Sequence, residues 1–358
     1  MSTKALKKVS NIGKIGVLGG LTAAVALVAA GCGSSSASGG SSPVTVHLGY
    51  FPNLTHAPAL VGVAQGIFAR DLGTDKLDAS QTFSAGPAEN QALLSGSIDI
   101  AFEGPSSALS AYSSSVGAVK IIAGAASGGA GLVTKASITQ PSQLKGKTIA
   151  SPQLANTQDV ALRYWLKQQG FSTTTSGGGD VSVQPSSTGN GTIVTEFKAG
   201  SIDGGWVPEP YESQMLAAGG HLLVDEATLW PGGNWATTNV VVRTAFLQEH
   251  PATVKRFLKG LVDTLGFMQA NPSQAQSAFN QQVASLQGGK SLSSALLATA
   301  WSRLKFTADP LAATLQTQVT HGVAVGLLKQ PSNLAGIYSL APLNSVLEAA
   351  GQQKVPGL

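Results

Sequence analysis

Polar residues follow expected strands at several points of the chain, and a helix is expected to begin at each of them. Lys145–Gly170 shows this best, because a short run at Thr148–Ala150 leads through a polar turn into a helical pattern with Asn156 as its N-cap. The first backbone N–H groups of such a helix have no partner within the helix and can donate hydrogen bonds to a small anion. The segment therefore predicts an anion-binding loop.

A repeat places a similar unit in each half of the chain. Gly96–Ser97–Ile98–Asp99 returns as Gly200–Ser201–Ile202–Asp203, 104 residues later, and the strands expected at Val44 and Thr148 have the same separation. The repeat indicates either two similar α/β lobes or a shared way of turning a helix into a strand with glycine at the helix C-terminus. Both interpretations fit, and we expect two α/β lobes that each direct strand ends and helix starts to one edge.

Ligands of open α/β sheets bind beyond the carboxyl ends of the strands, so we expect the site between the two edges. The candidate ligand-binding residues are Asn53, His56, Glu103, Gly104, Ser106, Ser107 and Ser127 in lobe one, and Gln153, Asn156, Thr157, Gln158, Trp206 and Glu209 in lobe two.

Some of these residues have more than one interpretation. His56 is a ligand donor, a packed polar residue or a surface residue, and Asn156 either only caps its helix or also contacts the ligand. Trp206 is a core residue or a lid over the ligand. Glu103 and Glu209 pair with a ligand amine or are ordinary loop carboxylates. Two uncompensated carboxylates about 4 Å from a bare anion would repel it by several kcal/mol at an effective dielectric constant near 20.

The N-terminus has the pattern of an export signal. Four lysines precede the uncharged run Ile15–Ala30, which ends in small residues before Cys32 and predicts a signal peptide over residues 1–31 with lipidation of Cys32. Ala29 stands where Leu is usual in a lipobox, so a cleaved signal without lipid is the alternative. A membrane-spanning anchor is disfavoured because the run is shorter than about 20 residues. Residues 32–43 are expected to be a flexible Gly/Ser tether.

Charge and composition exclude several classes of function. The chain has 22 Lys+Arg against 18 Asp+Glu, but four of the lysines precede Cys32, which leaves 18 against 18 and no basic patch for nucleic acid. Cys32 is the single cysteine, so no internal disulfide is expected. No His-Glu-x-x-His or Gly-x-Ser-x-Gly motif occurs, and Pro141 replaces the first glycine of a P-loop before Gly146–Lys147–Thr148. We expect no metal and no cofactor.

About 315 residues follow the tether, which favours two lobes over one core. We expect lobe one over residues 44–131, lobe two over 132–236, and a return to lobe one with C-terminal helices over 237–358. Apolar spacing from Pro251 to Met268 predicts a core-packing helix.

The order of motifs resembles the periplasmic solute-binding proteins of the aliphatic sulfonate, nitrate and taurine uptake family, from Val44 to about Gln269. The matching segments are GYFPN, FSAGPAENQALLSGSIDIAFEGPSSAL, QLKGKTIASPQLANTQDVALRYWL and AGSIDGGWVPEPY. This resemblance implies a two-lobe, type II periplasmic-binding-protein-like α/β fold, with a mixed sheet flanked by helices in each lobe and hinges near Ala130–Lys135 and Thr237–Val242. It also implies a monomer, lipid-anchored outside the cytoplasmic membrane, that delivers a small-molecule ligand to an ABC permease.

In the resemblance, Asn53 and His56 match the loop after the first strand, Gly104–Ser107 and Asn156–Gln158 match helix starts, and Trp206 with Glu209 matches a lobe-two loop. A taurine-like zwitterion fits best, because its sulfonate accepts hydrogen bonds from helix N-termini and its ammonium meets Glu103 or Glu209. Nitrate, bicarbonate and a thiamine-precursor-like heterocycle are the alternatives. An enzyme on this scaffold would need a catalytic Cys or a Cys-rich iron site, and a regulatory sensor would need a fused module. We therefore predict a binding protein.

Overall fold

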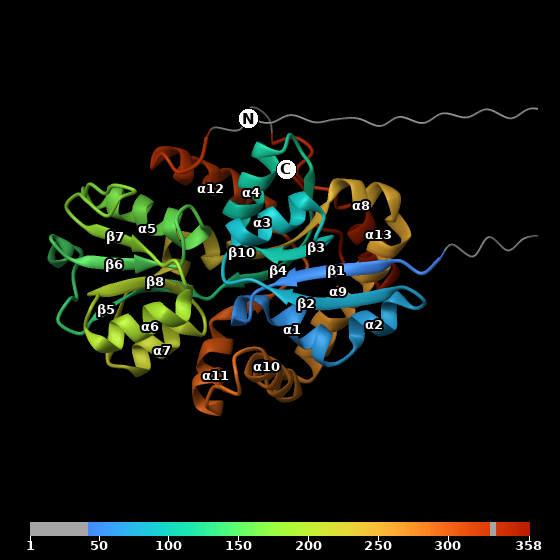
Figure 1. The fold of residues 1–358 in the computed structure, drawn as a ribbon, viewed down its shortest axis with the longest axis horizontal. Coiled ribbons are helices and arrows are strands. Elements are labelled where there is room, and N and C mark those ends of the chain that lie inside the picture. The colour runs from blue at the N-terminus through green and yellow to red at the C-terminus, as the bar shows by residue number, and fades with distance from the viewer. Residues whose placement is uncertain (1–41, 330–333) are drawn as a thin grey trace, which may run out of the picture. The chain divides into compact units, whose positions relative to one another are not determined.

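The computed structural model describes residues 42–329 and 334–358 (Figure 1). The expected signal peptide, Cys32 and the tether up to position 41 lie outside the described residues. In the part of the chain that is described, no helix has the length and apolar character needed to cross a membrane.

Two mixed β-sheets organise residues 43–358. The first has the order β11-β4-β10-β3-β1-β2, and the second has the order β7-β6-β8-β5-β9. Parallel pairs join β1 to β2 and β3, and β6 to β7 and β8, whereas β10 and β5 run antiparallel to their neighbours. The strands are β1 (Thr45–Tyr50), β2 (Lys76–Thr82), β3 (Ile100–Glu103), β4 (Val119–Gly128), β5 (Ala130–Lys135), β6 (Thr148–Ser151), β7 (Ser182–Pro185), β8 (Gly204–Pro208), β9 (Gly220–Asp225), β10 (Ala236–Arg243) and β11 (Leu304–Phe306).

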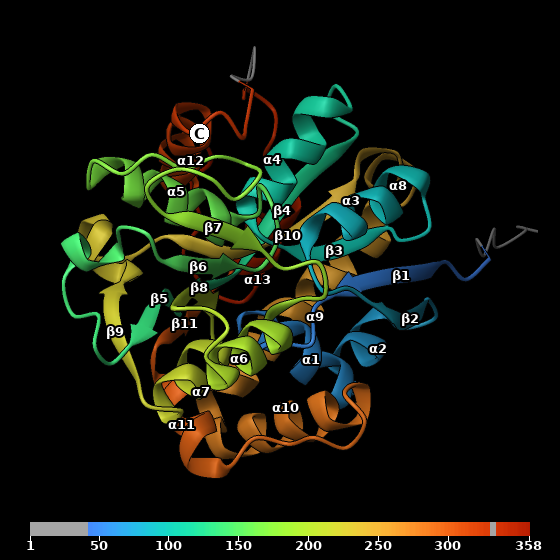
Figure 2. The same cartoon turned by 60° about the vertical axis from the view of Figure 1, so that its left-hand side comes forward.

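Helices cover both faces of each sheet, and each sheet with its helices is one lobe. Lobe two has α5 on one face and α6 and α7 on the other (Figure 2). In lobe one, α3, α4 and α12 pack on one face and α1, α2, α9 and α10 on the other. The helices are α1 (Ala57–Ala64), α2 (Ile67–Leu72), α3 (Gly86–Ser95), α4 (Pro105–Ser114), α5 (Thr157–Gln168), α6 (Asn190–Ala199), α7 (Tyr211–Ala217), α8 (Thr244–Glu249), α9 (Pro251–Ala270), α10 (Pro272–Leu286), α11 (Ser294–Ser302), α12 (Ala312–Ala324) and α13 (Ala341–Ala349). This arrangement confirms the predicted fold class.

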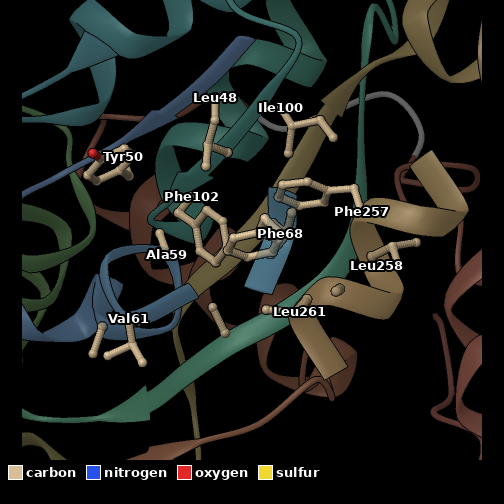
Figure 3. Close-up of a cluster of buried hydrophobic side chains, with 14 of the residues drawn as sticks. Leu48, Tyr50, Ala59, Val61, Phe68, Ile100, Phe102, Phe257, Leu258 and Leu261 are labelled. Carbon is tan, nitrogen blue, oxygen red and sulfur yellow. The ribbon is translucent and has the colours of Figure 1, made fainter. Parts of the chain in front are cut away.

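The lobe-one core centres on aromatic rings from α2, α9 and β3 (Figure 3). Phe68 stacks on Phe257 with ring centroids 4.6 Å apart, and Phe102 meets both rings edge-on. All three side chains are fully buried. The C-terminal helix predicted from apolar spacing is α9, and it supplies Phe257, Leu258 and Leu261 to this core.

The repeated tetrapeptide has the same structural role in both lobes. Gly96 and Gly200 end α3 and α6 in left-handed conformation, with φ of 79° and 75°. Three residues later, the Oδ2 atom of Asp99 accepts a 3.0 Å hydrogen bond from the N–H of His47 in β1, and Oδ2 of Asp203 accepts one of 3.0 Å from Thr148 in β6. Each aspartate thus links the start of the next strand, β3 or β8, to β1 or β6 of the same lobe. The repeat therefore reflects both two similar lobes and a shared turn from helix to strand.

The chain crosses between the lobes just before the two segments predicted as hinges. Ala130–Lys135 is the whole of β5 in the second sheet, and Thr237–Val242 lies inside β10 in the first. Strands held by ladder hydrogen bonds on both sides are poor hinges. The first crossing is at Gly128–Gly129, where φ values of 85° and 70° require glycine, and the second lies between β9 and β10.

Replacing Asp99 by alanine should lower the free energy of unfolding by about 2 to 3 kcal/mol, because the His47 N–H and Arg243 both lose a charged partner. Urea denaturation followed by tryptophan fluorescence measures this. Glu348→Ala is the control, since its pair with Lys354 is exposed and worth less than about 1 kcal/mol. Equal losses for the two variants would contradict the role assigned to Asp99.

Candidate functional site

A small cavity of about 30 Å³ lies between the two lobes, beyond the carboxyl ends of β1, β3, β6 and β8. Lobe one contributes Phe51, Asn53, Thr55, His56, Ser84, Ala85, Gly104 and Thr237, and lobe two contributes Pro152, Asn156, Gln158, Asn190 and Pro208. Of the predicted site residues, the structure brings Asn53, His56, Gly104, Asn156 and Gln158 together on its wall.

Four helices begin at this cavity. The N-caps of α3, α4 and α5, which are Ala85, Gly104 and Asn156, line it, and so does Asn190, the first residue of α6. The N-terminus of a helix carries a partial positive charge and N–H donors without helical partners, so it favours an anion. Asn156 also caps α5, because its Oδ1 accepts from the N–H of Asp159 at 2.9 Å. The arrangement places four helix N-termini, two from each lobe, beside one small cavity.

The two lobes touch at the starts of α4 and α5. The N–H of Ser106 donates to Oγ1 of Thr157 at 3.4 Å, and a Cβ added to Gly104 would lie 2.5 Å from the same oxygen. A second contact joins the N–H of Leu54 to the carbonyl of Glu209 at 3.2 Å. Glycine at position 104 is therefore what permits this close approach of the lobes.

His56 is a neutral hydrogen-bonding residue of the cavity wall. Its Nδ1 accepts from the N–H of Phe51 at 3.2 Å, and its ring stacks on that of Phe51 with centroids 4.3 Å apart. Burial lowers the pKa of His56 to about 3, so the ring carries no charge at neutral pH. Since Nδ1 is an acceptor, the proton is on Nε2, which can donate to a ligand.

Two predicted residues lie outside the cavity because distant partners hold their side chains. Trp206 is a core residue and not a lid, since its ring packs near Trp165 and its Nε1 donates to Glu226 at 2.8 Å. The carboxylate of Glu209 accepts from the N–H and hydroxyl of Ser213 at 3.1 and 2.8 Å, and lies 3.5 Å from Arg303. Burial raises the pKa of Glu209, and the hydrogen bonds from Ser213 and the charge of Arg303 oppose this shift.

The other predicted residues lie near the cavity without lining it. Ser106 and Ser107 lie in the first turn of α4, and Thr157 begins α5. The hydroxyl of Ser127 accepts from the N–H of Trp235 at 3.3 Å, close to the first crossing. Gln153 follows the wall residue Pro152, and Glu103 is fully buried behind Gly104.

The cavity residues that were not among the predicted site residues are Phe51, Thr55, Ser84, Ala85, Pro152, Asn190, Pro208 and Thr237. Ala85 precedes Gly86–Pro87, a helix start of the kind used to find the other walls, so that signal was present. Asn190 lies in a Gly-Asn-Gly segment that is also typical of a turn. Thr237 comes from β10, which returns from lobe two, and no local pattern marks it.

The cavity adjoins a wide groove of about 1200 Å³ between the lobes. Phe51, Asn53, Ser84 and Asn190 line both spaces. Among the described residues, those that line the groove include Lys198 and Lys290 but no carboxylate. The described chain also contains no group of three or more His, Cys, Asp or Glu side chains that could hold a metal ion.

The fold and the interlobe cavity define the class of two-lobe, periplasmic-binding-protein-like folds. The chain belongs to the NMT1-like family, which residues 39–284 match. It is 31% identical over 222 residues to the taurine-binding periplasmic protein of Escherichia coli strain K12, a match that covers 60% of this chain and 64%, less than two thirds, of that relative.

Solved structures share the fold at low sequence identity. The alkanesulfonate-binding protein SsuA of Xanthomonas axonopodis pv. citri bound to MOPS matches with a TM-score of 0.69 and 18% identity, over 84% of this chain and 99% of that chain. The periplasmic nitrate-binding protein NrtA of Synechocystis PCC 6803 matches with a TM-score of 0.70 and 14% identity, over 86% and 89%.

Adding a methyl group at position 104 should keep the lobes apart. Gly104→Ala has an allowed backbone conformation (φ −70°, ψ 144°), so its effect should come from the clash with Thr157 alone. Small-angle scattering should show a larger radius of gyration than for wild type, and adding Thr157→Ala should restore the wild-type value. Gly266→Ala is the control, because its methyl would meet open space. Identical radii for all variants would contradict the contact.

Proposed function

We propose that the protein is the solute-binding component of an ABC importer and captures a small organic anion of the sulfonate class. The observation that carries the proposal is the convergence of α3, α4, α5 and α6 on one cavity between two lobes. Neutral N–H donors suit an anion that keeps its charge at every physiological pH, as a sulfonate does. The similarity to the taurine-binding periplasmic protein supports this ligand class.

Binding would proceed by closure of the lobes. Cavities that hold organic ligands usually measure about 300 to 1000 Å³, whereas this one measures about 30 Å³. The lobes must therefore part to admit a sulfonate. We propose that they move about Gly128–Gly129 and the segment between β9 and β10, and that the ligand favours the closed form by contacting both walls.

The protein would carry its ligand without changing it. Of the described residues that line the cavity, His56 is the one with a titratable side chain, and burial keeps it neutral. Nucleophilic catalysis requires a nucleophile beside a base or a lowered pKa, and the hydroxyl of Thr55 instead donates to Asn53 at 2.9 Å. We extend the proposal to export, lipidation of Cys32 and delivery by a monomer to a membrane permease.

A negative charge at position 156 should abolish anion binding without unfolding α5. Aspartate caps a helix as well as asparagine does, but a carboxylate about 4 Å from a sulfonate opposes it by about 4 kcal/mol at an effective dielectric constant of 20. Asn156→Asp should therefore lower the affinity at least a hundredfold. Asn156→Ser is the control, because it keeps an uncharged cap and should bind within about tenfold of wild type.

Isothermal titration calorimetry of the mature protein with taurine, ethanesulfonate, nitrate and bicarbonate provides the measurement. Heat from a sulfonate that disappears in Asn156→Asp supports the proposal. No heat from either sulfonate, or equal affinity in wild type and Asn156→Asp, would reject it.

A further inference from the structure

One face of α5 contacts lobe one along the length of the helix. Thr157, in the first turn beside the cavity, accepts the hydrogen bond from α4. Tyr164 lies two turns later on the same face, and its ring stacks on that of His321 in α12, with centroids 3.7 Å apart and planes inclined by 14°. One turn further, Nζ of Lys167 donates to the carbonyl oxygen of Ala324, the last residue of α12, at 2.6 Å. Lobe-two side chains therefore hold the C-terminal end of α12, which lies beside α5 (Figure 2).

Helix α12 is itself fixed to lobe one. Leu315 belongs to the core that α3, α4 and α12 share, and Nε2 of Gln318 donates to the carbonyl of Ala236 in β10 at 3.1 Å. The ring of His321 also lies beside that of Trp230, in the segment between β9 and β10, with centroids 5.7 Å apart. One lobe-one side chain thus contacts both a lobe-two helix and the second crossing between the lobes.

These contacts lie outside the ligand cavity. The cavity residues closest to them in α5 are Asn156 and Gln158, and Tyr164 is about 9 Å beyond Gln158 along the helix axis. Since α5 is a single helix, a movement that separates the lobes at Thr157 also displaces Tyr164 relative to His321. The stack therefore belongs to the closed arrangement of the lobes without forming part of the cavity wall.

We propose that the stack of His321 on Tyr164, with the hydrogen bond of Lys167, is an interlobe latch that stabilises the closed form and so sets ligand affinity from outside the cavity. The effect on affinity rests on the proposed function, whereas the effect on the distance between the lobes does not. A contact made only in the closed form raises the population of that form, and apparent affinity rises with the population that is competent to bind. His321 is thus a positioning residue.

Protonation of His321 should weaken the latch. Burial lowers the pKa of His321, so the stacked ring is uncharged at neutral pH, whereas an exposed imidazole has a pKa of about 6.5. Opening of the lobes exposes the ring and permits it to take up a proton. Because the pKa is lower in the closed form, the latch has its full strength above about pH 6.5 and weakens as the pH falls below that value.

The other ionisable groups around α12 have partners of their own. Burial raises the pKa of Glu226, which accepts from Trp230, to about 7, so this carboxyl also titrates near neutral pH and has to be separated from His321 by experiment. The remaining groups on the elements that pack against α12 are Asp159 and Arg163 of α5, which pair with each other, Tyr112 of α4, which donates to Ala335, and Arg243 of β10, which pairs with Asp99.

Small-angle scattering without ligand tests the latch directly. Wild type should show a larger radius of gyration at pH 5 than at pH 7.5. His321→Phe keeps a ring that stacks but takes up no proton, so its radius should equal that of wild type at pH 7.5 and should not change at pH 5. His321→Ala should give the larger radius at both pH values. His221→Phe is the control and should behave as wild type, because His221 lies in β9 at the edge of the second sheet.

Calorimetry with taurine and ethanesulfonate measures the effect on binding, since both ligands keep the sulfonate charge between pH 5 and pH 7.5. At pH 7.5, His321→Ala and Tyr164→Ala should each weaken sulfonate binding at least fivefold. The double variant should be no weaker than His321→Ala, because either change already breaks the stack. Wild type should lose at least threefold in affinity from pH 7.5 to pH 5, and His321→Phe less than twofold.

Each other outcome rejects a distinct statement. Equal radii for wild type and His321→Ala at both pH values would overturn the latch. A pH dependence that persists unchanged in His321→Phe would overturn the role of His321 protonation and assign the effect to Glu226. Binding of neither sulfonate by wild type would reject the proposed function, and the scattering comparison would still decide whether the latch exists. Thermal unfolding shows whether each variant is folded, and Tyr164→Ala tests the latch if His321→Ala is not.

Discussion

Backbone N–H groups at a helix start have no helical partner, and this constraint shapes the centre of the molecule. Most proteins distribute such groups over the surface, where water satisfies them. Here α3, α4, α5 and α6 all begin at one cavity that both lobes enclose. The cavity wall therefore has partial positive charge, although α4 begins with Pro105 and the N–H groups of Ser106 and Ser107 are already paired. Since none of the described residues that line the cavity is charged, this environment suits a small anion better than a cation.

The lobes meet at several places, including a ring stack of Tyr164 on His321 with centroids 3.7 Å apart. Gly104 permits the starts of α4 and α5 to meet, and Arg303 of lobe one joins carboxylates of lobe two. Its Nη1 lies 2.7 Å from Glu212, while its Nε lies 3.5 Å from Glu209. Burial raises the pKa of Glu212 to about 8, and the charge of Glu209 raises it further, while the charge of Arg303 lowers it. Because Glu209 directly follows the wall residue Pro208, the contact of Arg303 with Glu209 also positions part of the cavity wall.

Local sequence patterns predicted the features that local interactions determine. The two lobes, the repeated Gly-Ser-Ile-Asp turn, the α5 cap at Asn156 and the α9 helix all follow from spacing within a few residues. The side-chain positions of Trp206 and Glu209 depend on partners that are not their neighbours in sequence. Trp206 donates to Glu226, which is 20 residues away, and Glu209 lies beside Arg303 of the other lobe. The local sequence therefore could not predict where these two side chains lie. Asn190 was missed for a different reason, because a glycine-flanked asparagine serves equally well in a turn and at a helix start.

Among the described residues, the lysine side chains of the site lie in the outer groove and not in the inner cavity. In the described part of the chain, no lysine or arginine lines the inner cavity, whereas Lys198 and Lys290 line the groove outside it. A dipole field is effective only at short range, so the inner donors act on an anion that has already entered and lost its water. Exposed lysines act over about 8 Å at physiological ionic strength and can increase the rate at which anions arrive. Under the proposed function, the lysines of the open groove would attract the ligand without binding it strongly, and the neutral inner donors would hold an anion that can still leave when the lobes part.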